Sequence, residues 1–269
     1  MEKSNHNFNA LNASLQNFRR DLAIVSFITV TELKSKIYDK SLGMFFLFLE
    51  PILMASVYYF LTMVLLGERL ETFGFLGIYS SVVFWRWYSR ISDAAPGIFI
   101  TYAQVIRQTN FPTHTIILAT VAVESANLMF GIVVLTGLML GLGGQINHNI
   151  IFLPMILLTQ VSVIIFFSIC LSCLGVFFKD LGGIIFALNG IWFYLSPGIY
   201  PVELVPEKYL TYYYMNPFAH ILPAYRQIFL EGTTPDLGGL LVILAIFSFL
   251  AAIAFRVVKQ CRKNFFSFM

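Results

Sequence analysis

The sequence has few charged residues and contains none of the motifs that mark nucleotide-binding or hydrolytic enzymes. Charged side chains make up 12% of the 269 residues and hydrophobic ones 58%, with a mean hydropathy of +0.78. A GxxxxGK[ST] phosphate loop is absent, and no Gly is followed by Lys. HExxH, nucleophile-elbow and DxD patterns are absent as well. These absences leave little support for an intramembrane enzyme, and any ATP-driven work would take its nucleotide site from another subunit.

Cysteine and histidine are also scarce. Cys170, Cys173 and Cys261 lie in or beside apolar runs and predict no disulfide framework. Cys170 and Cys173 form a CxxC with no other Cys or His nearby, so close helix packing explains them better than metal ligation or redox chemistry. The four histidines are scattered, and no metal site is expected. The first twenty residues contain no apolar core of a signal peptide, so no cleavable signal is expected.

Long apolar runs dominate the rest of the chain. Several exceed the roughly 20 residues that a helix needs to cross a bilayer. The predicted fold class is therefore an all-α integral membrane protein, with one transmembrane domain over residues 1–269. Six transmembrane helices are expected, at about residues 43–66, 72–95, 113–143, 150–178, 181–199 and 237–258.

The N-terminal part predicts an amphipathic helix, within residues 8–40, that lies in the membrane interface. Polar residues fill the other faces of an apolar stripe with spacings of three and four, formed by Phe8, Leu11, Leu15, Phe18, Leu22 and Val25. A coiled-coil stub is the alternative, although fewer than three heptads support it.

The placement of Lys and Arg predicts the orientation. With six spans, both termini lie on one side of the membrane, and the opposite side holds only Arg69, Lys208 and Arg226 of the 17 basic residues. Cytoplasmic loops carry the excess of Lys and Arg. Both termini are therefore expected in the cytoplasm.

Among the charged residues inside predicted spans, Glu50, Arg86, Arg90 and Glu124 are candidate members of an intramembrane charge network. An unpaired charge in the middle of a membrane-spanning helix costs at least ~2.5–3.5 kcal/mol, so each of these residues is expected to have a partner of opposite charge. We predict that Arg86 pairs with Glu50, Glu124 or both. The pairing could form a switchable network that lines a conduit, or a static ion pair that locks three helices together.

The stretch from Tyr194 to Arg226 is rich in proline and tyrosine. It contains five of the ten prolines, and four tyrosines occur between Tyr209 and Tyr214. Each proline removes a backbone donor, so an ordinary membrane helix is excluded. Irregular backbone at membrane depth occurs only where it is buried in protein or lines a wet cavity. The pattern predicts two short re-entrant helices that form a gate or pore mouth on the extracytoplasmic side; an interfacial loop is the alternative.

Two further features suggest interactions. Prolines at positions 96 and 112 bracket a predicted short helix, Gly97–Phe111, outside the bilayer core. This helix is either a lever that an ATPase subunit could push or an ordinary loop helix. Aromatic residues gather with polar ones at helix ends, where sugar rings could stack: Phe84, Trp85, Trp87, Tyr88, Trp192 and Tyr194.

Several short motifs together resemble one protein family. They are LEP at 49–51, WRWYSRIS at 85–92, NFP at 110–112, FFKDLGG at 177–183, and SPGIYP at 196–201 followed by VP, NP and YR. With the N-terminal amphipathic helix, this pattern resembles the permease subunit of bacterial ABC exporters for surface polysaccharides: O-antigen, capsule and teichoic acid. The resemblance covers nearly the whole chain.

The resemblance implies a homodimer in the bacterial cytoplasmic (inner) membrane, with the two copies enclosing a translocation channel. Two cytoplasmic ABC ATPase subunits would bind ATP and Mg, so this chain would hold no cofactor. The substrate would be a lipid-linked polysaccharide, with membrane lipid around the protein and no nucleic-acid partner. In this reading Gly97–Phe111 is a coupling helix, and a gate hairpin occupies residues 200–232.

The same resemblance assigns expected roles to individual residues. The residues expected to couple to the ATPase are Tyr102, Val105, Ile106, Arg107, Gln108 and Phe111. The aromatic residues expected along the channel are Phe84, Trp87, Tyr88, Trp192 and Tyr194. The residues expected at the gate are Pro197, Tyr200, Pro201, Tyr213, Asn216, Pro217 and Arg226.

Two alternatives stay open. An ABC permease for a drug or a small lipid would share the broad architecture, but a broken, tyrosine-rich hairpin suits a wide polar chain better. A membrane-bound polymerase or glycosyltransferase of polysaccharide assembly is disfavoured, because the sequence has neither a nucleotide-sugar domain nor an acidic pair.

Overall fold

The computed structural model describes residues 16, 19–35, 43–66, 74–108 and 112–265, and these residues form helices and connecting turns without any strand. An N-terminal helix over residues 19–35 precedes the main helices. The elements are α2 (Gly43–Leu66), α3 (Gly74–Thr101), α4 (Ala103–Gln108), α5 (Thr113–Gly141), η2 (His148–Phe152), α6 (Leu153–Phe177), α7 (Leu181–Tyr194), η3 (Val202–Leu204), α8 (Glu207–Tyr213), α9 (Phe218–Arg226), η4 (Gln227–Glu231) and α10 (Leu237–Phe265).

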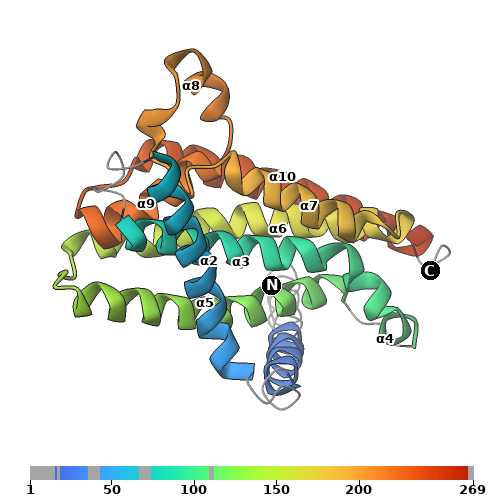
Figure 1. The fold of residues 1–269 in the computed structure, drawn as a ribbon. Helices are drawn as coiled ribbons and strands as arrows, with labels where there is room; N and C mark the ends of the chain where they lie inside the picture. Colours follow the sequence, from blue (N-terminus) through green and yellow to red (C-terminus); the bar gives the residue numbers. More distant parts are fainter. Residues whose placement is uncertain (1–15, 17–18, 36–42, 67–73, 109–111, 266–269) are drawn as a thin grey trace, which may run out of the picture.

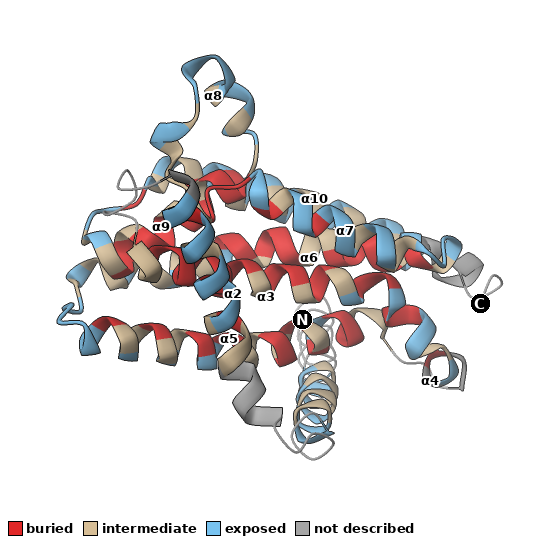
Figure 2. Cartoon of the chain, viewed as in Figure 1, coloured by how far each residue is buried: buried red, intermediate tan, exposed pale blue. Residues whose placement is uncertain are grey.

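Helix α3 lies at the centre of the bundle. It packs against α2, α5, α6, α7 and α9, while α10 packs mainly on α6. In Figure 1, α3, α5, α6 and α10 run alongside one another, and α2 crosses them steeply. Figure 2 shows the buried residues concentrated on α3, α6 and α9, with exposed residues on α8. Because most of α3 is buried, its polar groups are largely removed from water, and a partner inside the protein stabilises each group that finds one.

The composition of the helices confirms an integral membrane protein. Three helices among the described residues are long and apolar enough to cross a bilayer: Thr113–Gly141, His148–Phe177 and Leu237–Lys259. Shorter apolar helices occupy Leu49–Val64 and Leu181–Tyr194. Helix α3 has 28 residues, but Arg86, Arg90 and Asp93 lower its hydropathy.

The predicted boundary at Pro96 is wrong, because α3 continues through this proline to Thr101. A proline inside a helix loses one hydrogen bond, but packing against a neighbouring helix can support it. Here Gly175 of α6 lies directly against Pro96, and a Cβ at Gly175 would overlap the proline backbone. The turn comes at Tyr102 instead, and the following helix α4 is only 6 residues long.

The fifth apolar helix is also shorter than predicted. Helix α7 ends at Tyr194, and turns occupy residues 195–200 where the prediction continued the span to 199. A residue before proline avoids the helical conformation, so Pro197 favours this early end. The 14 residues of α7 rise only about 21 Å.

Candidate functional site

Four charged residues, Glu50, Arg86, Arg90 and Glu124, form one network between α2, α3 and α5. Glu50 pairs with Arg86, as predicted, and its second carboxylate oxygen accepts a hydrogen bond of 2.5 Å from Arg90. Arg90 also lies 3.6 Å from Glu124, which accepts a 2.9 Å hydrogen bond from Asn127. Arg86 and Arg90 are four residues apart and therefore lie on one face of α3. Two arginines and two glutamates balance, so the network carries no net charge.

A second polar contact joins α3 to α7, and the sequence reasoning missed it. Asn189 donates a hydrogen bond of 2.7 Å to Asp93. Asn189 is 4% exposed, and it is the single amide side chain in the apolar helix α7. A single amide in an otherwise apolar helix could have predicted this contact from the sequence, because a buried polar side chain requires a hydrogen-bond partner.

A cavity of about 220 Å³ adjoins these contacts between α2, α3 and α7. Its walls combine the polar groups of Arg86, Asp93 and Asn189 with the rings of Tyr58 and Phe186. Phe186 is 66% exposed beside the cavity. Apolar walls with a few convergent polar groups are typical of ligand sites.

Most of the predicted channel aromatics are packed inside the chain. Phe84, Trp87 and Tyr88 are 0%, 4% and 2% exposed, so in this conformation they cannot stack on a polymer. The prediction that these three line an open surface is therefore wrong for this conformation. Trp192 is partly buried, whereas Tyr194 is 50% exposed.

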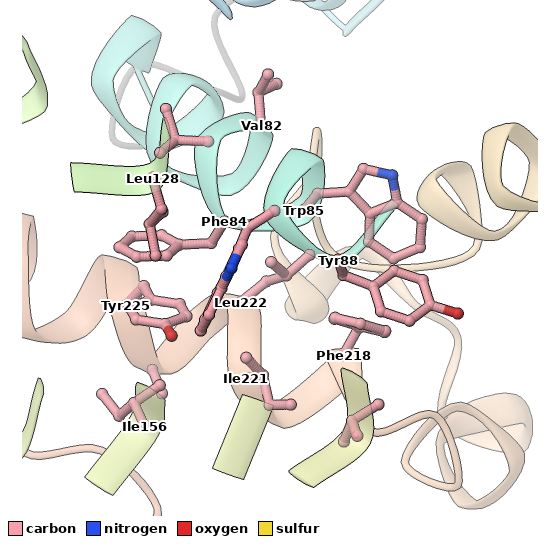
Figure 3. Packing of buried hydrophobic residues seen from close by; sticks show 14 of the residues in the cluster. Val82, Phe84, Trp85, Tyr88, Leu128, Ile156, Phe218, Ile221, Leu222 and Tyr225 are labelled. Atoms are coloured by element: carbon pink, nitrogen blue, oxygen red, sulfur yellow. The ribbon is translucent and has the colours of Figure 1, made fainter. Parts of the chain in front are cut away.

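The buried rings hold α9 against α3 instead. Phe84 stacks on Tyr225 with ring centroids 3.4 Å apart, and Tyr88 packs on Phe218 at 4.8 Å. Figure 3 shows these α3 and α9 side chains facing one another, with Leu222 between the two pairs. The second half of the proline-rich element thus belongs to the hydrophobic core, which the sequence pattern did not indicate.

The predicted gate residues divide into a packed part and a projecting part. Asn216 organises the packed part: its amide donates to Ser196 over 2.8 Å, and its carbonyl oxygen accepts from Trp192 at 3.1 Å and from the backbone N–H of Phe218 at 3.0 Å. Pro217 is the N-cap of α9, where a missing N–H costs nothing. Arg226, at the end of α9, is 7% exposed and binds Glu231 over 2.8 Å.

The projecting part is the hairpin around α8, which stands out from the bundle in Figure 1. Within it, the hydroxyl of Tyr213 donates to that of Tyr200 at 3.4 Å, and Tyr200 donates to the carbonyl of Tyr194 at 3.2 Å. Burial and the bond to Tyr200 raise the pKa of Tyr213 well above its usual value. Pro201 precedes the short helix η3, while Pro197 is buried at the base of the hairpin.

One of the predicted coupling residues, Tyr102, contacts the N-terminal helix. Tyr102 donates a hydrogen bond to Glu32, and burial together with this bond raises the pKa of Tyr102 above its usual value. His114 lies 3.0 Å from Asp21, so a second contact joins this helix to α5. Ile106 is buried. Val105, Arg107 and Gln108 belong to α4, although their side chains, like all of Phe111, lie outside the described residues.

We find no candidate metal site in the part of the chain that the structure describes. No group of three or more His, Cys, Asp or Glu residues there could hold a metal ion. Cys170 and Cys173 both lie on α6.

The apolar helices around an internal charge network define a polytopic membrane protein. The chain belongs to the ABC-2 type transporter family, whose profile matches residues 25–230. This finding confirms the resemblance to an ABC exporter permease.

Three relatives cover most of the chain, and each is named O-antigen export system permease protein RfbA. Two come from Klebsiella pneumoniae: one is 28% identical over 214 residues, 79% of this chain and 82% of that protein. The other is 27% identical over 213 residues, covering 79% and 81%. The third, from Myxococcus xanthus, is 22% identical over 236 residues, covering 87% and 90%.

Proposed function

We propose that this chain is the membrane channel subunit of an ATP-driven exporter that moves a lipid-linked polysaccharide, of the O-antigen type, across the bacterial cytoplasmic membrane. The observation that carries the proposal is the match to three O-antigen export permeases over at least 79% of this chain and 81% of each relative. The family match over residues 25–230 includes the helices that surround the charge network.

The channel is formed by two copies of the chain, which face each other across α2 and α7. Helix α7 buries only Asn189 and Phe193, so nearly all of its surface is available to a partner or a substrate. Large apolar side chains of α2, such as Val57 and Phe60, are 56% and 68% exposed. Exposed apolar area of this extent requires lipid or protein to cover it.

The polymer passes along the surface where α2 and α7 meet the 220 Å³ cavity. Tyr58 and Tyr194, whose centroids lie 6.0 Å apart, offer ring faces for the apolar sides of sugars. Asp93, held by the hydrogen bond from Asn189, offers a carboxylate oxygen to sugar hydroxyls. This surface replaces the buried aromatics of α3 as the conduit lining.

The remaining assignments follow from the orientation that the basic residues predict. Six spans place both termini in the cytoplasm. Helix α3 is one of these spans, because ion pairing lowers the free-energy cost of its charged side chains inside the bilayer. Two cytoplasmic ABC ATPase subunits dock at α4 and the N-terminal helix. These subunits bind Mg²⁺ and hydrolyse ATP at their own nucleotide sites. On the opposite side, the hairpin at residues 200–232 closes the channel as a re-entrant gate.

The test is to inactivate the gene in its source cell and measure polysaccharide at the cell surface and in the lipid-linked pool of the cytoplasm. We expect loss from the surface together with an accumulated internal pool, restored by the wild-type gene. Loss from the surface without an internal pool would point to a role in synthesis. An unchanged surface and pool would point to a drug or small-lipid permease.

A further inference from the structure

An open and largely apolar groove of about 460 Å³ lies at one end of the bundle, away from the proposed conduit. Phe99 from the end of α3, Ile117 and Leu118 from the start of α5, Ile165 and Ile169 from α6, and Phe255 from α10 form its apolar walls. No residue of α2, α7 or α9 lines it. Its volume falls within the range of about 300–1,000 Å³ that is common for small-molecule sites.

The groove opens onto an apolar outer surface of the bundle. Leu118 and Phe255, from its two sides, are each 39% exposed. Ile253 and Val257, which flank Phe255 on α10, are 43% and 50% exposed. In a membrane protein such a surface faces the hydrocarbon of lipid, so lipid chains have direct access to the groove.

Only one end of the groove is polar. Thr113 and His114 begin α5, and Lys259 lies one helical turn beyond Phe255 on α10. Lys259 is exposed, and Arg256 is three positions away on the same helix, hence its neighbour on the surface.

An acidic group near this end, from the N-terminal helix, is already engaged. Asp21 of the N-terminal helix lies 3.0 Å from His114 and 3.7 Å from Arg20. The side chains at the polar end therefore present an excess of positive charge. An apolar groove with a positively charged end is complementary to a phospholipid, which has apolar chains and an anionic head group.

We propose that this groove binds an anionic phospholipid of the surrounding bilayer, with one acyl chain along the apolar walls and the phosphate beside Lys259. Basic pockets between membrane helices on the cytoplasmic side favour anionic head groups electrostatically. Burial of each methylene adds further free energy to the binding of the chain. The inference does not depend on which polymer the protein exports.

The bound lipid would connect the two elements that meet at the groove. His114 anchors the N-terminal helix through Asp21, and Lys259 belongs to the C-terminal helix α10. A phospholipid between them would stabilise the end of the bundle that carries α4 and the N-terminal helix.

The experiment places a fluorescent reporter in the groove and offers lipids that quench it. Leu118→Trp is reconstituted in vesicles of phosphatidylcholine and phosphatidylglycerol in equal amounts, with only one of the two lipids brominated on its acyl chains. The signal of the parent protein, which has Trp85, Trp87 and Trp192, is subtracted. We expect stronger quenching by brominated phosphatidylglycerol, corresponding to about fivefold preference for one lysine–headgroup interaction.

Variants of Lys259 test the role of the charge. Lys259→Gln should remove the preference, and Lys259→Arg should retain it. Lys179→Gln removes the same charge from the exposed turn between α6 and α7, outside the groove, and should leave the preference unchanged. Because Leu118→Trp could perturb folding, native mass spectrometry of the parent, Lys259→Gln and Lys179→Gln proteins counts retained phosphatidylglycerol independently.

Three results would overturn the proposal. Equal quenching by both lipids would mean ordinary contact with bulk lipid, and absence of quenching would mean that protein fills the groove. An equal loss of preference in Lys179→Gln would assign the effect to overall surface charge.

Discussion

Arg90 of α3 donates a hydrogen bond to Glu50 of α2 over 2.5 Å, although the two residues lie 40 positions apart in the chain. Glu50 also pairs with Arg86, so a single carboxylate serves two arginines. Glu124 is less central, because its oxygen lies 3.6 Å from Arg90. We therefore expect removal of the Glu50 charge to reduce the stability of the fold more than removal of the Glu124 charge.

Glu50→Gln should destabilise the protein more than Glu124→Gln. The first change leaves two partly buried arginines sharing one glutamate, and loss of one partner costs up to about 3–5 kcal/mol when an ion pair is fully buried. The second change keeps the Arg90–Glu50 bond. Thermal unfolding of the purified variants, together with the yield of folded protein, measures the difference. Adding Arg86→Met to Glu50→Gln should recover part of the loss, whereas equal effects of the two single changes would refute the ranking.

Asn216→Ala should loosen the connection between the end of α7 and the start of α9. The change removes the acceptor of the Trp192 and Phe218 N–H groups, and each buried group left without a partner costs about 1–3 kcal/mol. It also removes the donor to Ser196, whose hydroxyl keeps its bond to the carbonyl of Trp192. We expect a lower unfolding temperature and reduced export. Asn216→Asp, which keeps the acceptor oxygen, should be intermediate.

Tyr212→Ala is the control for Asn216, since Tyr212 is 74% exposed on the projecting hairpin. It should leave the unfolding temperature nearly unchanged. A decrease as large as that of Asn216→Ala would show that the hairpin, and not the Asn216 hydrogen bonds, sets the stability.

Gly175→Ala should disrupt the packing of α3 on α6. A Cβ at this position would overlap the backbone of Pro96, which cannot move as a flexible side chain does. Overpacking of this kind costs about 1–3 kcal/mol. Gly137→Ala on α5 is the matched control, because its Cβ would meet no atom within 4 Å. The yield and unfolding temperature should decrease for Gly175→Ala alone; equal behaviour would contradict the close approach of the two helices.

Tyr102→Phe should weaken the docking of the N-terminal helix without unfolding the bundle. The change removes the hydroxyl that binds Glu32. Hydrogen exchange should become faster over residues 19–35 and stay unchanged in α6. Tyr209→Phe, on the exposed face of α8, should affect neither segment. Protection of residues 19–35 that is unaffected by Tyr102→Phe would mean that other contacts hold this helix.

The pH dependence of that contact follows from the raised pKa of Tyr102. A pKa that is higher in the folded than in the unfolded protein stabilises the fold below the unfolded value and loses this effect as pH rises through the folded value. The usual tyrosine value is about 10. Near neutral pH the hydroxyl therefore keeps its proton, and ionisation of Tyr102 should not release the helix there.

Much of the architecture was accessible from local properties of the sequence. The length and polarity of the apolar runs predicted an all-helical membrane protein, because the bilayer sets both requirements. The cost of burying a charge predicted that Arg86 pairs with a glutamate, and Glu50 is that partner. The proline-rich stretch was expected to be broken, and the structure has short helices there.

The tertiary structure decided which surfaces these elements share. Aromatic residues at a helix end look alike in sequence whether they line a channel or fill a core, and only the position of α9 buries Phe84 and Tyr88. Likewise, Pro96 stays inside α3 because Gly175, far along the chain, lies against it. The bond from Asn189 to Asp93 requires α7 beside α3. Hydropathy and proline content act within a few turns of chain, whereas burial and pairing depend on neighbours that only the packed bundle supplies.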